Sequence, residues 1–338
     1  MSALPDPRPV EEAPLPGSRA ALDAIRAEGR PRVLRGLVDS WPAVAAARQG
    51  NEAMVRHLLE GGAAKPVAAI AAAPDQQGRF FYNDDLSGLN FMRGQGRLET
   101  FLADLLRAGE MDDPPGMAVQ SETVRDLLPA FHRANRLNLL PKVEPRIWIG
   151  NRIRVAAHFD IKENIACCVA GRRRFTIFPP DQVANLYPGP FELTPAGTPV
   201  SLVDFADPDP VRHPGFAEAL ACAQQVTLEP GDAVYIPYCW WHGVESLDSL
   251  SILVNYWWTD GQPDRIGSPY DALLHAILSF RHLPPEQRAV WRDMLDYYVF
   301  EESGDPAAHL PPQARGVLGA PRPALFDHIR NILRGALG

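Results

Sequence analysis

Between residues 116 and 260 the chain is a series of short apolar and β-branched runs separated by turn residues, and this pattern constrains the fold most strongly. Each run has the length of a β-strand and is too short for most helices. The clearest runs are residues 146–150, 152–160, 164–170, 173–178, 225–228, 233–236, 241–246 and 250–258. Short strands at this spacing are typical of a sandwich or barrel and not of a parallel α/β sheet.

The turn at residues 229–232 reads Glu-Pro-Gly-Asp. Proline followed by glycine at the centre fits a type II turn, which requires a positive φ at its third residue. We therefore predict that this turn joins residues 225–228 and 233–236 as two antiparallel strands.

The segments on either side of the β-rich region combine helices with a few strands. Before it, the sequence predicts helices at residues 18–28, 41–48, 51–59 and 98–108 and strands at 31–37, 65–70 and 79–82. After it, apolar residues at helical spacing predict helices at 270–280, 285–300 and 324–333. The predicted organisation is a flexible Pro-rich arm (1–17), an N-terminal α/β extension packed on the barrel (18–115), the barrel (116–265) and a C-terminal helical region (266–338).

The composition excludes several classes of function. The net charge of −8 argues against sequence-independent nucleic-acid binding, which requires clustered Lys and Arg. Neither a signal peptide nor an apolar run of membrane-spanning length is visible. The four cysteines contain no CxxC pair and are expected to be reduced thiols. We predict a cytoplasmic protein without nucleic-acid or membrane partners.

A candidate metal site lies in the run Val-Ala-Ala-His-Phe-Asp at residues 155–160. Residues two apart on a strand share a face, so His158 and Asp160 project together, with Ala156 before them on that face. His242 follows a later predicted strand. Two histidines and a carboxylate are the ligand set of non-haem Fe(II) oxygenases and leave positions open for a co-substrate and O₂. An HxD pair alone is common, and the chain has nine histidines, so the motif by itself leaves a role without metal open.

Two segments carry a wider resemblance to a known family. They are RIWIGNRIRVAAHFDIKENIACCVAGRRRFTIFPPDQVANLYPGP (146–190) and EPGDAVYIPYCWWHGVESLDSLSILVNYWW (229–258). In order, spacing and turn residues they resemble the JmjC-type, cupin-like Fe(II)- and 2-oxoglutarate-dependent hydroxylases, most closely the asparaginyl hydroxylase called factor inhibiting HIF. PRVLRGLVDSWPAV (31–44) and GRFFYNDDLSGLNF (78–91) look like the family's N-terminal region. The resemblance implies a mainly β fold, a double-stranded β-helix or jelly-roll.

The resemblance also implies roles for individual residues. It assigns the iron ligands and catalytic centre to His158, Asp160 and His242. It places near the metal and the 2-oxoglutarate co-substrate, or near the substrate, a further set of residues: Asn164, Asn255, Arg173, Tyr82 and Asn90. Trp257 shares a strand face with Asn255 and is therefore expected to look into the same site.

Three positions depart from the family pattern. Arg173 replaces the lysine that pairs with the distal carboxylate of 2-oxoglutarate, Val155 replaces a threonine, and Ala118 replaces a tyrosine. Alternation puts Arg173 on the apolar face of its strand, where a guanidinium needs an anionic partner such as a ligand carboxylate. The alternative is a solvated turn whose arginine stem lies on the apolar surface.

We predict an oxygenase that uses iron and 2-oxoglutarate to hydroxylate a protein side chain or a small molecule. Two alternatives remain: a metal cupin enzyme that works without 2-oxoglutarate, and a non-catalytic binding module. The C-terminal helices resemble the family's dimer region, so we predict a homodimer. Their apolar positions are equally compatible with packing on their own barrel.

Overall fold

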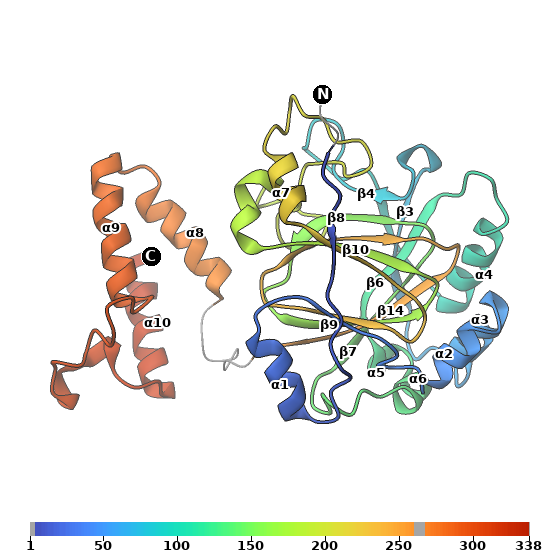
Figure 1. Ribbon diagram of the computed structural model, residues 1–338, viewed down its shortest axis with the longest axis horizontal. Coiled ribbons are helices and arrows are strands. Elements are labelled where there is room, and N and C mark those ends of the chain that lie inside the picture. Colours follow the sequence, from blue (N-terminus) through green and yellow to red (C-terminus); the bar gives the residue numbers. More distant parts are fainter. Residues whose placement is uncertain (1–3, 260–267, 338) are drawn as a thin grey trace. The chain divides into compact units, whose positions relative to one another are not determined.

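The computed structural model describes residues 4–259 and 268–337 (Figure 1). It divides into two compact units, Met1–Trp258 and Thr259–Gly338. Among the described residues, the first unit contains the β-strands and the candidate site, and the second contains three α-helices and two short 3-10 helices.

The first unit is built from two β-sheets. The six-stranded sheet has the order β1 (Arg8–Pro9), β11 (Gln224–Leu228), β10 (Arg173–Phe178), β13 (Trp241–Ser246), β8 (Arg154–Phe159), β4 (Arg79–Phe80). The eight-stranded sheet has the order β2 (Arg32–Leu34), β12 (Ala233–Ile236), β9 (Glu163–Ala170), β14 (Ser251–Trp258), β7 (Pro145–Gly150), β6 (Gly116–Thr123), β3 (Val67–Ala72), β5 (Met92–Gly96). From β7 to β14 the chain passes repeatedly between the two sheets, which is the winding of a double-stranded β-helix. The predicted jelly-roll is confirmed.

Within residues 4–259, four apolar clusters hold this unit together, and two of them are the largest. One lies in the barrel, where inward residues of both sheets meet, among them Phe175, Ile177, Val234 and Leu253. The larger one packs the eight-stranded sheet against helices. The helices of the unit are α1 (Arg19–Ala27), α2 (Pro42–Ala47), α3 (Asn51–Leu59), α4 (Leu98–Ala108), α5 (Val124–Leu127), α6 (Pro129–Ala134) and α7 (Phe216–Cys222). The residues on both faces of the central strands are therefore buried, which explains their nearly continuous apolar sequence.

The predicted hairpin around residues 229–232 is wrong. Gly231 has the positive φ (111°) that the turn requires. However, β11 pairs with β1 and β10, whereas β12 pairs with β2 and β9 in the other sheet. The turn therefore carries the chain across the barrel corner, because local turn geometry does not determine which strand supplies the hydrogen-bonding partner.

The N-terminal arm lies along the edge of the barrel. Its strand β1 runs parallel to β11, and the Val10 N–H donates to the carbonyl of Gln225 at 3.0 Å. The Ala13 N–H then donates to the carbonyl of Val33 in the other sheet at 2.9 Å. Residues 8–13 thus cover an edge strand of each sheet, which protects backbone groups that would otherwise be open to pairing.

The second unit consists of α8 (Pro269–Phe280), α9 (Pro285–Tyr298) and α10 (Pro323–Leu337), close to the predicted helices. Neither α8 nor α9 buries a residue, and Leu278 is 68% exposed. No helix within residues 4–259 and 268–337 is both long and apolar enough to cross a bilayer.

A substitution at Gly171 tests the packing of the β9–β10 turn. Gly171 has φ 65°, and a Cβ there would lie 2.3 Å from the backbone oxygen of Leu250. We expect Gly171→Ala to lower the free energy of unfolding by about 3 kcal/mol, measured by chemical denaturation, because both backbone strain and a clash with rigid backbone result. Gly94→Ala, where no atom lies within 4 Å, is the control and should change it by less than about 0.5 kcal/mol. Equal effects would contradict this packing.

Candidate metal centre

The side chains of His158, Asp160 and His242 come together where the neighbouring strands β8 and β13 pair. His158 on β8 and His242 on β13 are directly paired across the strands, and their ring centroids are 4.5 Å apart. Asp160 follows β8, and one of its carboxylate oxygens is 3.6 Å from Nε2 of His242. The possible ligand atoms of the three residues all lie within 4.8 Å of one another. Two imidazoles and one carboxylate in this arrangement fit a metal ion held on one side, with the other positions open.

The hydrogen bonds of the two rings fix their orientation. Nδ1 of His158 lies 3.0 Å from the carbonyl oxygen of Ala156, and Nδ1 of His242 lies 3.0 Å from that of Trp240. A carbonyl oxygen only accepts, so Nδ1 carries the proton in each ring. Nε2 of each ring is thereby left to bind a metal, which is the usual arrangement of metal-bound histidines.

Burial keeps His242 in the form that a metal requires. The ring is 4% exposed, and burial, with a smaller contribution from His158, lowers its pKa to about 4 although Asp160 opposes the shift. His242 is therefore neutral near pH 7, and only neutral imidazole binds a metal.

Two buried asparagines extend the cluster. Nδ2 of Asn164 on β9 lies 3.5 Å from an oxygen of Asp160, and Nδ2 of Asn255 on β14 donates to Oδ1 of Asn164 at 2.8 Å. The structure therefore places both predicted asparagines next to the triad, as a chain that orients the carboxylate. Oδ1 of Asn255 is buried without a hydrogen-bond partner among the described residues.

This chain gives a prediction for metal binding. We expect Asn164→Ala to weaken iron(II) affinity about tenfold, measured by competition with a chelator, because Asp160 loses the amide that orients it. Asn138→Ala removes an exposed amide that forms no hydrogen bond with the triad or with either buried asparagine among the described residues, and it should leave the affinity unchanged. Unchanged affinity in Asn164→Ala would show that the asparagine does not support the carboxylate.

Arg173 lies deeper on the same inner face. On β10, Ile177 is paired with His242 and Arg173 with Ser246, so alternation places both β10 side chains on one side. Arg173 is 4% exposed, and it donates hydrogen bonds to the Ser251 hydroxyl at 2.7 Å and the Ser251 carbonyl at 3.5 Å. Burial lowers its pKa to about 10, so it remains a cation at neutral pH. No carboxylate among the described residues forms an ion pair with it.

The prediction that Ala156 shares a strand face with His158 is wrong, because a β-bulge shifts the register of β8. The pairs His242–His158 and Val244–Val155 show that Val155, and not Ala156, shares the inner face with His158, because the register shifts opposite Gly243. Val155 and Ala118, the two departures from the family pattern, both pack in one apolar cluster with Ile70 and Phe80. This side of the barrel interior therefore lacks the two hydroxyl groups of the family pattern.

Trp257 lies on β14 next to the buried asparagines, and its role in the site stays a prediction. It pairs with Asn164 across the strands, and its ring meets Trp148 edge-on at 5.9 Å. Both indole N–H groups are buried and lack an acceptor among the described residues. Buried donors of this kind usually meet a ligand or water. Trp148 is not among the site residues predicted from the sequence. Its position between Ile147 and Ile149, which face the helices, indicates by strand alternation that Trp148 faces the barrel interior.

Tyr82 and Asn90 lie in a different environment. Both line a surface cavity of about 550 Å³ whose walls include none of the triad residues. The Asn90 amide is used locally: it accepts from the Phe81 N–H at 2.8 Å and donates to Gln76 and to the carbonyl of Arg79. Their assignment to the substrate entrance stays a prediction.

Comparison with known proteins decides the family. Residues 18–263 match the model of the family described as "Cupin-like domain". The chain belongs to this cupin-like family. Relatives include human "Bifunctional peptidase and (3S)-lysyl hydroxylase JMJD7", 26% identical over 68% of this chain and 77% of that protein. The resemblance to JmjC-type hydroxylases is thereby confirmed, whereas the finer likeness to the asparaginyl hydroxylase stays a prediction.

Other relatives match over a shorter stretch of this cupin-like chain. "Lysine-specific demethylase JMJ31" of Arabidopsis thaliana is 34% identical over 36% of the chain and 23% of that protein. Human "HSPB1-associated protein 1" is 36% identical over 34% of the chain and 23% of that protein. The matches thus span about a quarter of the length of these relatives.

Proposed function

We propose that the protein is an iron(II)- and 2-oxoglutarate-dependent oxygenase, with His158, Asp160 and His242 as iron ligands. When bound, iron(II) with 2-oxoglutarate supplies the oxidation of a substrate C–H bond by O₂, while 2-oxoglutarate is decarboxylated to succinate. The donor set, the hydrogen bonds that leave Nε2 of both rings available and the neutral state of His242 support this assignment.

The observation that carries the proposal is the buried guanidinium of Arg173. An arginine out of contact with water and without an acidic partner costs free energy unless an anion joins it. It faces the same barrel interior as the triad, so a dicarboxylate reaching from the metal towards β10 would supply that anion. We propose that Arg173 binds the distal carboxylate of 2-oxoglutarate through its planar fork.

In this proposal two serine hydroxyls replace the threonine and tyrosine hydroxyls that bind the distal carboxylate in the family pattern. Ser251 Oγ already contacts Arg173 at 2.7 Å. Ser246 is the cross-strand partner of Arg173, and its buried Oγ has no hydrogen-bond partner among the described residues. We propose that both hydroxyls share the carboxylate with Arg173, in place of the threonine and tyrosine that Val155 and Ala118 replace.

Other residues orient and shield the reaction. Asn164 and Asn255 hold the Asp160 carboxylate, and the apolar side chains of the barrel interior exclude water from the metal. Trp257 and Trp148 present two indole N–H donors beside the centre, and we propose that they contact the substrate.

A protein or peptide is the substrate class that we propose. Two relatives are named as a (3S)-lysyl hydroxylase and a lysine-specific demethylase, so we propose a lysine residue of a protein or peptide as one candidate target. We favour hydroxylation over demethylation because the longest of the reported matches is to the hydroxylase.

Free thiols at all four cysteines fit a reducing compartment, so we propose that the protein lies in the cytoplasm.

The test of the reaction class is succinate formation. The protein, loaded with iron(II) in air and supplied with 2-oxoglutarate and a lysine- or asparagine-containing peptide mixture, should form succinate, detected by NMR. Omission of iron or exclusion of O₂ should abolish it. Iron-dependent oxidation of the peptides that proceeds without 2-oxoglutarate would favour the second candidate, a metal cupin enzyme, which the apolar surroundings of Val155 and Ala118 make the main competitor.

We also propose that the C-terminal unit forms a homodimer. Its helices expose several large apolar side chains: Leu273, Leu274, Leu278, Val290, Trp291, Met294 and Tyr298. We expect the wild-type chain to sediment as a dimer, and the double substitution Leu274→Glu with Leu278→Glu to convert it to a monomer, because both would bury charge at the interface. Val211→Glu, at an 87% exposed aliphatic residue of the barrel unit, is the control. A monomeric wild type, or a dimeric double variant, would contradict the proposal.

A further inference from the structure

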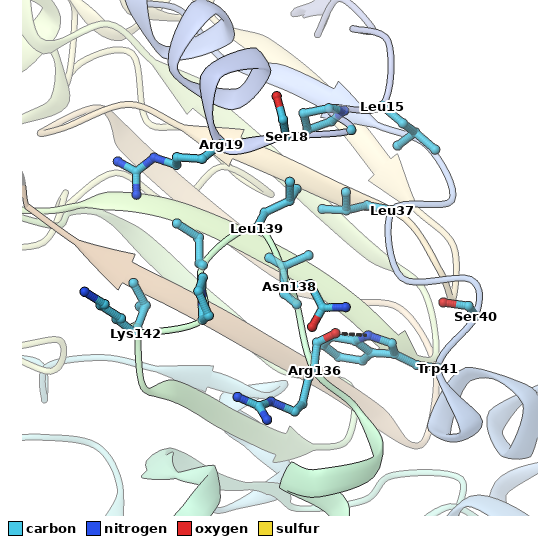
Figure 2. Close-up of a pocket in the computed structure, with 16 residues that line it drawn as sticks. Leu15, Ser18, Arg19, Leu37, Ser40, Trp41, Arg136, Asn138, Leu139 and Lys142 are labelled. Carbon is cyan, nitrogen blue, oxygen red and sulfur yellow. Dashed lines mark hydrogen bonds between the residues drawn. The ribbon is translucent and has the colours of Figure 1, made fainter.

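A groove of about 640 Å³ opens on the surface of the barrel unit, within the size range of ligand sites (Figure 2). Three segments form it: residues 15–19 at the start of α1, residues 37–41 between β2 and α2, and residues 136–143 between α6 and β7. None of the residues proposed to hold iron or 2-oxoglutarate lines this groove. It is therefore a separate feature with its own chemistry.

Hydrogen bonds hold the walls of the groove in place. The indole N–H of Trp41 donates to the carbonyl of Arg136 at 3.2 Å, which links two of the three segments (dashed in Figure 2). The Leu137 N–H donates to the hydroxyl of Tyr256 on β14 at 3.1 Å and anchors the loop to the sheet. A groove that is formed before binding loses little conformational entropy when a ligand enters.

The groove presents aliphatic side chains to solvent from all three segments. Leu15 is 52% exposed, and Leu37 and Leu139 are partly buried on the facing segments. Figure 2 shows the three leucines gathered around the upper half of the groove. Covering this surface with an apolar side chain would remove it from water.

The charged residues that line the groove are all cations. Sixteen residues line it, with Arg19, Arg136 and Lys142 among them and no Asp or Glu, although the chain has 41 acidic and 33 basic residues. Arg19 pairs with Asp23 at 2.9 Å. Arg136 and Lys142 are exposed and make no ion pair with a residue that the structure describes. A cationic rim on an acidic protein is complementary to a negatively charged ligand.

The spacing of these cations indicates the form of the ligand. In Figure 2 the ends of Arg19, Arg136 and Lys142 lie at separate places around the groove and do not converge on one point. A single phosphate or carboxylate would be met by converging donors. Separated cations beside an apolar floor instead match several carboxylates spread along an extended chain that also carries an apolar side chain.

We propose that this groove binds an acidic peptide segment of a partner protein. An aliphatic or aromatic side chain of the peptide packs among Leu15, Leu37 and Leu139, and its carboxylates face Arg136 and Lys142. This site does not depend on the chemistry proposed for the metal centre.

The test is fluorescence anisotropy on the full chain with a dye-labelled peptide in which leucine and phenylalanine are flanked by glutamates. We expect saturable binding that weakens with added salt. Arg136→Glu combined with Lys142→Glu should weaken it at least about tenfold, and Leu15→Asn should weaken it at unchanged charge. Arg133→Glu, an exposed residue of α6 that does not line the groove, should bind as the wild type does.

Several results would overturn the proposal. They are absence of binding, equal binding of a peptide with lysines in place of the glutamates, and undiminished binding by the double charge variant with an unchanged melting temperature. Binding of anionic lipid vesicles without binding of the peptide would also overturn it, because the ligand would then be a membrane surface.

Discussion

Replacing His242 with alanine is expected to abolish stoichiometric iron(II) binding and all iron-dependent succinate formation. The substitution removes one of three ligands and leaves His158 and Asp160, a pair that cannot hold the ion against water and buffer at micromolar concentration. Iron content after gel filtration and succinate yield are the two measurements. We expect the same result for His158→Ala.

The control for this experiment is His309→Ala, which removes an exposed histidine of the C-terminal unit. His309→Ala should retain iron binding and turnover, because His309 is not one of the three proposed iron ligands. Full iron occupancy in His242→Ala would contradict the assignment of the triad, whatever its effect on activity.

Arg173→Met is expected to weaken 2-oxoglutarate binding by at least about 100-fold, because a ligand carboxylate would be left buried without its cation. The same substitution should not destabilise the protein in the absence of ligand. Among the described residues the buried guanidinium forms hydrogen bonds only with Ser251, and the lowering of its pKa to about 10 corresponds to a cost on the order of 3 kcal/mol at neutral pH. Because the pKa in the folded state lies below that of the unfolded chain, this cost is fully present below pH 10.

A matched control lies next to it in the sequence. Arg174 occupies the opposite face of β10 and pairs with Glu245 at 3.1 Å, where it is 41% exposed. Arg174→Met should leave the affinity for 2-oxoglutarate unchanged. The assignment of Arg173 would be wrong if both variants bound equally well, and a large fall in the melting temperature of Arg173→Met would show that its role is structural.

The parts of the site that depend on short-range pattern were predictable from the sequence. Strand alternation brings His158 and Asp160 together, and helix N-capping by Ser18 places the start of α1, where its hydroxyl accepts from the Ala21 N–H at 3.2 Å. These features depend on neighbours a few residues away, so a single sequence contains the necessary information.

Other parts depend on pairings that a single sequence does not reveal. The bulge that displaces Ala156 arises between strands more than 80 residues apart, and Asn255 reaches Asn164 from 91 residues away. The turn at Gly231 has the predicted local form yet joins two different sheets. The cationic groove is made by loops without hydrophobic periodicity, which explains why no pattern indicated it.

The most direct test of the central claim is an anaerobic titration of the iron(II)-loaded protein with 2-oxoglutarate, followed by visible absorption. We expect a saturable metal-to-ligand charge-transfer band that is absent in His158→Ala, shifted to much higher 2-oxoglutarate concentration in Arg173→Met, and unchanged in Arg174→Met. Absence of the band in wild-type protein that demonstrably contains iron would rule out 2-oxoglutarate as the co-substrate, because the metal and Arg173 would then serve a different ligand.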